Sequence, residues 1–161
     1  MAANLALSLA KADHKTLLVD LDLRNPGLYS FFPRLQPAAA DAFNWKAMNR
    51  SVQAYSPQLD VVLISGQAVH PPEVLESHHL QDYFTQAREK YEFIIFDSPA
   101  VLNSVDPSIS SALADLIVMT AESSHTKHEE FSTAVKKIRN CNDRPIYGVL
   151  NFSDRRRDAS A

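Results

Sequence analysis

The sequence predicts an α/β fold in which a mostly parallel sheet carries helices on both faces. Segments with helical spacing alternate with short apolar segments along the chain, as in proteins whose helices connect parallel strands. The short segments are continuous apolar runs, which is typical of strands that are buried on both faces. The chain has 161 residues, 45% of them hydrophobic, and this is enough for one domain with a substantial core.

Five short apolar runs are expected to form the strands. In the first and the third, the run is followed directly by a carboxylate, Asp20 and Asp97, and the fifth is followed by Asn151. Continuous apolar character over four to seven residues, bounded by polar or turn-forming residues, favours a strand over a helix. The five runs lie at residues 16–19, 59–65, 93–96, 116–120 and 146–150.

Five helical segments are expected around these strands. Residues 21–37 contain several prolines and a glycine, so they are expected to form a loop. Thr126 and Glu129 have the spacing of a capping box and are expected to begin the last helix. The expected helical segments lie at residues 1–12, 38–48, 73–90, 107–114 and 126–139.

The composition limits the expected number of domains and the kinds of partner that the protein can bind. No internal repeat or linker interrupts the pattern, so we expect one domain over residues 1–153 and a tail over residues 154–161. The net charge is −3 and the pI about 6.0, so no basic field favours nucleic acid. The apolar runs are too short to span a membrane, and residues 1–12 lack the basic start of a secretory signal. A cytoplasmic protein is therefore expected.

Polar side chains at the ends of three strands predict a ligand site. In open parallel sheets, ligands bind beyond the carboxyl ends of the strands, where Asp20, Asp97 and Asn151 are expected to lie. One carboxylate in such a place is equally well explained as a helix cap or a turn residue. Two on a common edge fit a Mg²⁺-phosphate site, because magnesium prefers hard oxygen ligands. Spacing alone leaves both interpretations open.

The order of several short motifs resembles that of the bacterial tyrosine kinases of exopolysaccharide export. Residues 17–26 look like the family's D-x-D-x-R motif, called Walker A′, and residues 93–99 look like its Walker B strand. The MinD and ParA ATPases, which are deviant-Walker P-loop proteins, share most of these motifs, but Arg24-Asn25-Pro26 favours the kinase branch. The resemblance covers about residues 2–153. The other matching segments, in the same order, are residues 70–77, 105–106, 114–118 and 146–151.

The resemblance implies a role for each matched polar residue. Asp20 would contact Mg²⁺ and accept the proton of the attacking tyrosine hydroxyl, and Asp22 would be a second catalytic carboxylate beside the metal. Asp97 would hold Mg²⁺ through a water molecule. Arg24 would pair with phosphate or with a neighbouring subunit, and Asn151 would lie near the adenine of ATP. For Asp22 and Arg24, the alternative is an ion pair within a loop that has little consequence.

The sequence departs from the family at its phosphate-binding loop. A P-loop needs glycines and a lysine around the phosphates, but none of the three glycines, Gly27, Gly66 and Gly148, is followed by lysine. In the family, Gly-Lys-Ser/Thr directly precedes a helix like the one expected at residues 1–12, so Met1 is expected to fall just after the P-loop. The family's C-terminal tyrosine cluster is also not found, because no tyrosine follows Phe152. Binding of ATP by this chain is therefore expected to be weak or absent.

Three functions remain open at this point. The first is a tyrosine-kinase-like ATPase domain that regulates capsule or exopolysaccharide export and is inactive as this chain stands. The second is a non-catalytic interaction module derived from that family, and the third is a MinD/ParA-type partition ATPase. The resemblance implies Mg²⁺ and ATP as cofactors. It also implies a membrane chain-length determinant or polysaccharide export protein as partner, a homo-oligomer, and a location at the inner face of the membrane through that partner.

The resemblance also predicts a defect in the sheet. In the family, the P-loop strand lies inside the sheet, next to the Walker B strand, which here is residues 93–97. Without it, backbone groups beside this strand are expected to be unpaired, at about 1–3 kcal/mol for each group that is buried without a partner. We therefore expect poor folding or self-association, and not closure of the neighbouring strands.

Overall fold

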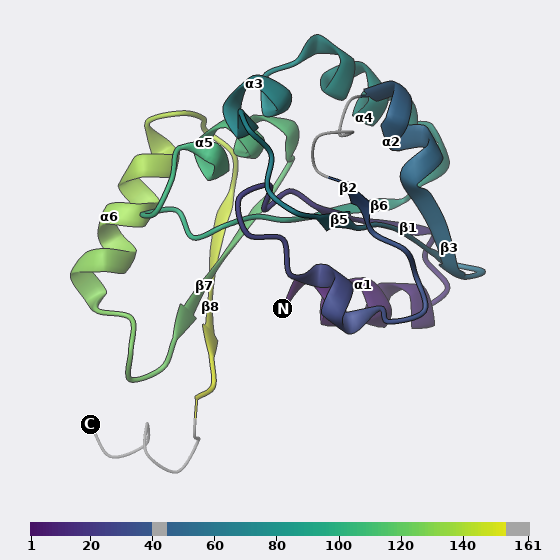
Figure 1. The fold of residues 1–161 in the computed structure, drawn as a ribbon. Helices are drawn as coiled ribbons and strands as arrows, with labels where there is room; N and C mark the ends of the chain where they lie inside the picture. The colour runs from purple at the N-terminus through teal and green to yellow at the C-terminus, as the bar shows by residue number, and fades with distance from the viewer. Residues whose placement is uncertain (40–44, 154–161) are drawn as a thin grey trace. The chain divides into compact units, whose positions relative to one another are not determined.

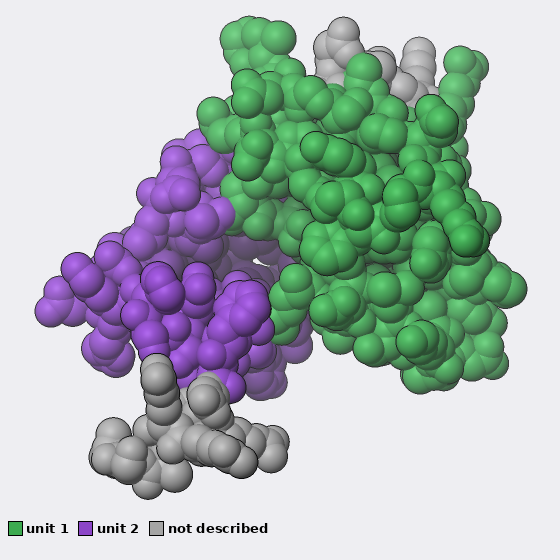
Figure 2. All heavy atoms as spheres, turned by 60° about the horizontal axis from the view of Figure 1, so that its bottom comes forward, with its two compact units in different colours: residues 1–99 green, residues 100–161 purple. Residues whose placement is uncertain are grey.

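The structure, a computed structural model, describes residues 1–39 and 45–153. The chain forms two compact units, residues 1–99 and residues 100–161, which are coloured separately in Figure 2. Each unit is described below by itself. The single domain expected over residues 1–153 stays a prediction, and the tail expected over residues 154–161 lies outside the described residues.

A four-stranded sheet forms the centre of the first unit, in the order β3-β4-β1-β6 (Figure 1). Strand β1 (Thr16–Asp20) pairs in parallel with β4 (Leu59–Val62) on one side and with β6 (Phe93–Asp97) on the other. Strand β3 (Val52–Ser56) is antiparallel to β4 and forms one edge. All five residues of β1 are buried, as the continuous apolar run predicts for a central strand.

Helices cover both faces of this sheet, which confirms the predicted fold class (Figure 1). On one face lies α1 (Ala2–Lys11), whose buried Ala3 and Ala6 pack in one cluster with Leu18 of β1 and Ile95 of β6. On the other face lies α4 (His78–Lys90), where the rings of Phe84 and Phe96 meet edge to face at 4.6 Å.

The shorter elements of this unit differ from the expected ones in two places. The helix expected over residues 38–48 is wrong at its start, because β2 (Ala38–Ala39) pairs in parallel with β5 (Ile64–Ser65). Residues 40–44 lie outside the described residues, and α2 (Trp45–Ser51) follows them. The helix expected over residues 73–90 is two helices, α3 (Pro71–Leu75) and α4, because the Ser77 hydroxyl accepts the N–H of Leu80 and begins a new helix.

The second unit is built on two parallel strands, β7 (Ile117–Glu122) and β8 (Ile146–Asn151). Helices α5 (Asp106–Ser110) and α6 (His128–Arg139) belong to it, with a 3₁₀ turn, η3 (Ser111–Leu113), between α5 and β7. Its core contains Met119 of β7 with Ala134 and Ile138 of α6.

The capping box expected at Thr126 and Glu129 is wrong by one residue. The backbone N–H of Lys127 donates to the Glu130 carboxylate at 3.1 Å, so the helix begins one position later than expected. The Thr126 hydroxyl instead accepts the N–H of Glu122 at 2.9 Å and closes the turn after β7. The Thr126 side chain therefore stabilises the turn after β7, and it does not cap the helix as the spacing predicted.

Candidate functional site

The ends of β1 and β6 bring two carboxylates together. Asp20 is the last residue of β1 and Asp97 the last of β6, and the two are partners in the parallel register. The N–H of Leu21 donates to the carbonyl of Asp97 at 2.8 Å, which holds the strands together just where they end. The expectation that Asp20 and Asp97 share the carboxyl edge of the sheet is confirmed.

Asp20 is completely buried and is held by backbone donors. One carboxylate oxygen, Oδ1, accepts the N–H of Asp22 at 3.1 Å, and the other, Oδ2, accepts the N–H of Leu28 at 3.2 Å. The loop after β1 therefore folds back over the carboxylate, and it continues into a 3₁₀ turn, η1 (Leu28–Phe31). Burial raises the pKa of Asp20 from 3.8 to about 6, although the two backbone hydrogen bonds lower it.

The carboxylates of Asp20, Asp22 and Asp97 influence one another's charge at this end of the strands. Burial raises the pKa of Asp97, the Met1 ammonium lowers it, and the negative charge of Asp22 raises it again. The charges of Asp97 and Asp22 also contribute to the raised pKa of Asp20. Asp22 itself is half-buried, and its Oδ1 accepts the N–H of Asn25 at 2.9 Å. Arg24 of the same loop is exposed.

The oxygen-rich donor set fits a hard divalent cation. Among the described residues, no group of three or more Asp, Glu, His or Cys side chains is placed to hold a metal ion, so the site depends on Asp20 and Asp97. Burial raises the pKa values of both carboxyl groups, and such groups gain from a cation that offsets their charge. Magnesium takes carboxylate and water oxygens and usually needs only one or two carboxylates from the protein. For the phosphates of ATP the fit is incomplete, because the sequence has no Gly-Lys pair to bind them.

Asn151, the residue expected near adenine, belongs to the second unit. It ends β8 opposite Glu122 of β7, and its backbone carbonyl accepts the N–H of Ser123 at 2.9 Å. Its side-chain oxygen accepts the N–H of Phe152 at 3.1 Å. The residue thus lies at a strand end as expected, but its place beside Asp20 stays a prediction.

The similarity to known proteins agrees with this arrangement. Tyrosine-protein kinase YwqD of Bacillus subtilis is 29% identical over 153 residues, which are 93% of this chain and 65% of YwqD. The solved kinase domain of VpsO is 27% identical, with a TM-score of 0.83 over 95% of this chain and 77% of that one. This chain is similar to the bacterial tyrosine-protein kinases. No family model matches it.

Two further matches are to proteins with other names. The succinoglycan biosynthesis transport protein ExoP of Rhizobium meliloti is 26% identical over 96% of the chain, which is 20% of ExoP. The septum site-determining protein MinD of Pyrococcus horikoshii, solved with Mg-ADP, has a TM-score of 0.69 over 92% of this chain and 62% of that one. At 16% identity, MinD shows the fold alone. The chain spans less than two thirds of the length of YwqD and about a fifth of the length of ExoP.

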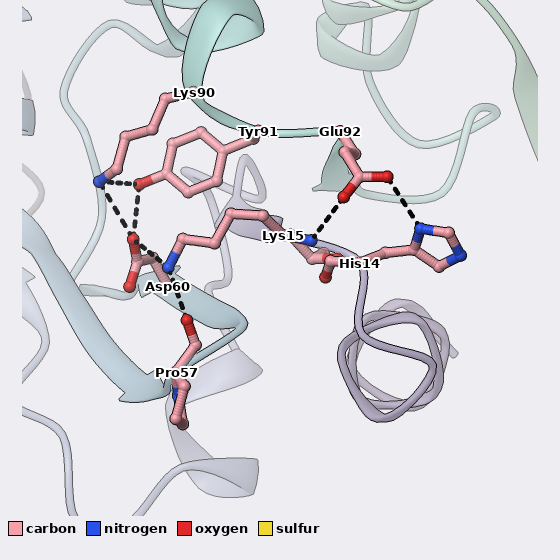
Figure 3. A network of polar contacts seen from close by, with 8 residues as sticks. His14, Lys15, Pro57, Asp60, Lys90, Tyr91 and Glu92 are labelled. Atoms are coloured by element: carbon pink, nitrogen blue, oxygen red, sulfur yellow. Dashed lines mark hydrogen bonds and ion pairs between the residues drawn. The ribbon is translucent and has the colours of Figure 1, made fainter.

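A second polar cluster, which sequence reasoning missed, lies at the opposite ends of the same strands (Figure 3). Asp60 of β4 is buried, and its Oδ2 accepts the Tyr91 hydroxyl at 2.7 Å. The ammonium groups of Lys90 and Lys15 lie 3.2 and 3.4 Å from the same oxygen. Beside them, Glu92 contacts His14 Nδ1 at 2.9 Å. A carboxylate inside an apolar run signals that a partner is needed, but spacing does not reveal residues 30 positions away.

A surface pocket of about 190 Å³ lies beside this second cluster and not beside the candidate site. Neither Asp20 nor Asp97 lines it. The residues that line the pocket are Asn49, Val52, Tyr83, Gln86, Ala87, Lys90 and Tyr91.

In the part of the chain that the structure describes, none of the helices combines the length and the apolar character that a membrane span requires.

Proposed function

We propose that this chain carries the magnesium-binding carboxylates of a tyrosine-kinase-type ATPase domain that acts in capsule or exopolysaccharide export. The observation that carries the proposal is the pairing of Asp20 and Asp97 at adjacent strand ends, with Asp20 buried under two backbone N–H groups. Buried carboxylates with raised pKa values in a sheet-edge site are frequent at functional positions. The similarity to YwqD and VpsO supports the tyrosine-kinase branch.

In the proposed reaction, each carboxylate has its own task. Magnesium, when bound, would neutralise charge on the transferred phosphoryl group of ATP. Asp20 would hold the cation and take the proton of the tyrosine hydroxyl, and Asp22 would lie beside it. Asp97 would act through a bound water, Arg24 on phosphate or a neighbouring subunit, and Asn151 near adenine. The proposed partner is a membrane chain-length determinant or export protein, which would keep this cytoplasmic domain at the membrane.

The chief rival is a non-catalytic interaction module, and one observation favours it. The sequence offers no Gly-Lys pair for the β- and γ-phosphates, so carboxylates alone would face the triphosphate. A partition ATPase is less well supported, because the likeness to MinD shows the fold alone. We therefore expect that the isolated chain has no micromolar affinity for MgATP.

Calorimetry and a fusion protein test the proposal together. The chain alone should bind Mn²⁺, a spectroscopic stand-in for Mg²⁺, and Asp97→Asn should weaken this binding about tenfold or more, whereas exposed Asp82→Asn should not. Fusion of a P-loop strand with its Gly-Lys-Ser/Thr loop ahead of Met1 should add micromolar MgATP binding, and phosphotyrosine on an added tyrosine-containing peptide should become detectable by mass spectrometry. Asp20→Asn in the fusion should abolish the phosphotyrosine. A well-folded fusion that binds no MgATP would contradict the kinase proposal and favour the interaction module.

A further inference from the structure

The surface pocket beside the second polar cluster combines buried aromatic walls with exposed polar side chains. All of its lining comes from residues 1–99, so the pocket belongs to one unit. Among the lining residues, the buried ones are Tyr83, Ala87 and Tyr91, and the exposed ones are Asn49, Gln86 and Lys90. Apolar walls with a few polar groups are typical of sites for small molecules, and a volume of about 190 Å³ restricts the ligand to a small one.

One side of α4 makes most of this pocket. The lining residues on this helix recur at spacings of three and four residues, so they lie on the same side of it: Tyr83, Gln86, Ala87 and Lys90. Ala87 lies between the larger Tyr83 and Lys90 along this side, and its short side chain leaves room for a ligand. The pocket therefore follows from one small residue between two large ones on a helix.

The charges beside the pocket do not balance. The ammonium groups of Lys90, which lines the pocket, and of Lys15 lie 3.2 and 3.4 Å from the same Asp60 oxygen (Figure 3). Burial tends to raise the pKa of Asp60, but its hydrogen bonds and the two ammonium charges hold it below 3.8, so the carboxylate is ionised at neutral pH. Two positive charges thus share one negative charge. The Lys90 side chain is 61% exposed, so its ammonium is accessible to an anion from solution.

The Tyr83 hydroxyl is a second donor at the pocket. Tyr83 is only 7% exposed, and its hydroxyl makes no hydrogen bond to another residue of the described chain. Burial raises the pKa of Tyr83 to about 12, so the hydroxyl keeps its proton at neutral pH. A protonated hydroxyl that has no acceptor among the described residues is available to an acceptor on a ligand.

We propose that this pocket binds a small carboxylate that carries a flat ring. The carboxylate accepts hydrogen bonds from the Lys90 ammonium and the Tyr83 hydroxyl, and the ring lies against Ala87 and Tyr91. The Lys90 ammonium is 4.7 Å from the centre of the Tyr91 ring, so one small ligand reaches both. Hydrogen bonds between ionised groups are stronger than neutral ones, so a carboxylate is preferred over the corresponding neutral amide. The inference does not depend on the proposed enzymatic function.

Titration of the full chain with benzoate at pH 7, followed through the amide NMR signals of the protein, tests the proposal. A ligand of this size gains limited free energy, so a dissociation constant on the order of 1 mM is expected. The shifted amide signals should centre on residues 83–91. Benzamide, which has the same ring without the charge, should bind about tenfold more weakly or less.

Two variants test the residues of the pocket. Lys90→Gln should weaken benzoate binding about tenfold, and the fold should persist because Lys15 still pairs with Asp60, whereas Lys11→Gln, an equal loss of charge on α1, should leave binding unchanged. Tyr83→Phe removes a hydroxyl without a described protein partner, so stability should persist while benzoate binding weakens about 3- to 10-fold. Equal affinity for benzoate and benzamide, unchanged benzoate affinity in either pocket variant, or no binding at about 20 mM benzoate would overturn the proposal.

Discussion

Replacement of Asp20 by asparagine is expected to stabilise the protein increasingly as the pH rises. Burial raises the pKa of Asp20 to about 6 in the folded chain, from 3.8, the ordinary value that we assign to the unfolded chain. Because the pKa is higher in the folded chain, the contribution of Asp20 to folding stability is fully present below pH 3.8 and is lost as the pH rises through 6. Ionised Asp20 thus costs about 3 kcal/mol of folding free energy above pH 7, from about 1.36 kcal/mol per pKa unit.

The measurement is urea unfolding of wild type and Asp20→Asn between pH 4 and pH 8 without divalent cations. Each oxygen of the Asp20 carboxylate accepts one backbone N–H, and asparagine replaces one of these oxygens with an NH2 group, so one hydrogen bond is lost. This loss costs about 1–2 kcal/mol at every pH and offsets part of the gain in stability. The difference in unfolding free energy between variant and wild type should still increase by about 2–3 kcal/mol from pH 4 to pH 8. The control, Asp82→Asn on the exposed side of α4, should show a constant difference. A flat profile for Asp20→Asn would mean that the carboxylate is not desolvated.

Replacement of Asp60 by asparagine is expected to have the opposite effect. Burial tends to raise the pKa of Asp60, but the hydrogen bonds from Tyr91 and Lys90 and the charges of Lys15 and Lys90 outweigh it, so the pKa lies below 3.8. A lowered folded pKa contributes stability above the unfolded value, and this stability is lost as the pH falls through the folded pKa. Removal of the charge leaves two ammonium groups around one neutral amide.

We expect Asp60→Asn to destabilise the protein by about 2–3 kcal/mol at pH 7. Breaking a fully buried ion pair costs about 3–5 kcal/mol, but here the side chains of Lys90 and Lys15 are 61% and 28% exposed, so solvent screening reduces the loss. Urea unfolding at pH 7 and pH 3 measures it, and the loss should shrink at the lower pH. Tyr91→Phe, which keeps the charges and removes one hydrogen bond, should lose about 1 kcal/mol. Equal stability of Asp60→Asn and wild type at pH 7 would contradict the role of this cluster.

The sequence predicts the parts of the fold that depend on apolar runs. Strands β1 and β6 and the carboxylates that end them follow from two continuous apolar runs, although only β1 is completely buried and the side chains of β6 are half-buried or exposed. Strand β3 was missed because Val52–Ser56 is mostly polar and half-exposed at an edge, where packing and not intrinsic preference decides the conformation. The two-residue strand β2 exists only because Leu63 and β5 lie beside it, and local sequence does not contain that neighbour.

The candidate site was predicted in its residues but not in its environment. Asp20 was found from its place after a strand, yet the donors that bind it are the backbone N–H groups of Asp22 and Leu28, which any residue type offers. The raised pKa depends on burial by the folded loop, so it follows only from the structure. Asp60 was visible as a charge inside a strand, but its partners Lys90 and Tyr91 come together only through the parallel pairing of β1, β4 and β6.

The order in which β1 finds its partners has a consequence for synthesis of the chain. Thr16 pairs first with Leu59, and its second neighbour, Phe93, is made 77 residues after it. At about 5–20 residues per second, the ribosome needs roughly 4–15 s to cover that stretch. During this time a strand that is completely buried in the folded protein lacks at least one of its partners. Chaperone demand during translation should therefore be concentrated before Phe93 emerges, and rare codons placed between β4 and β6 should lower the yield of folded protein more than the same codons placed after β6.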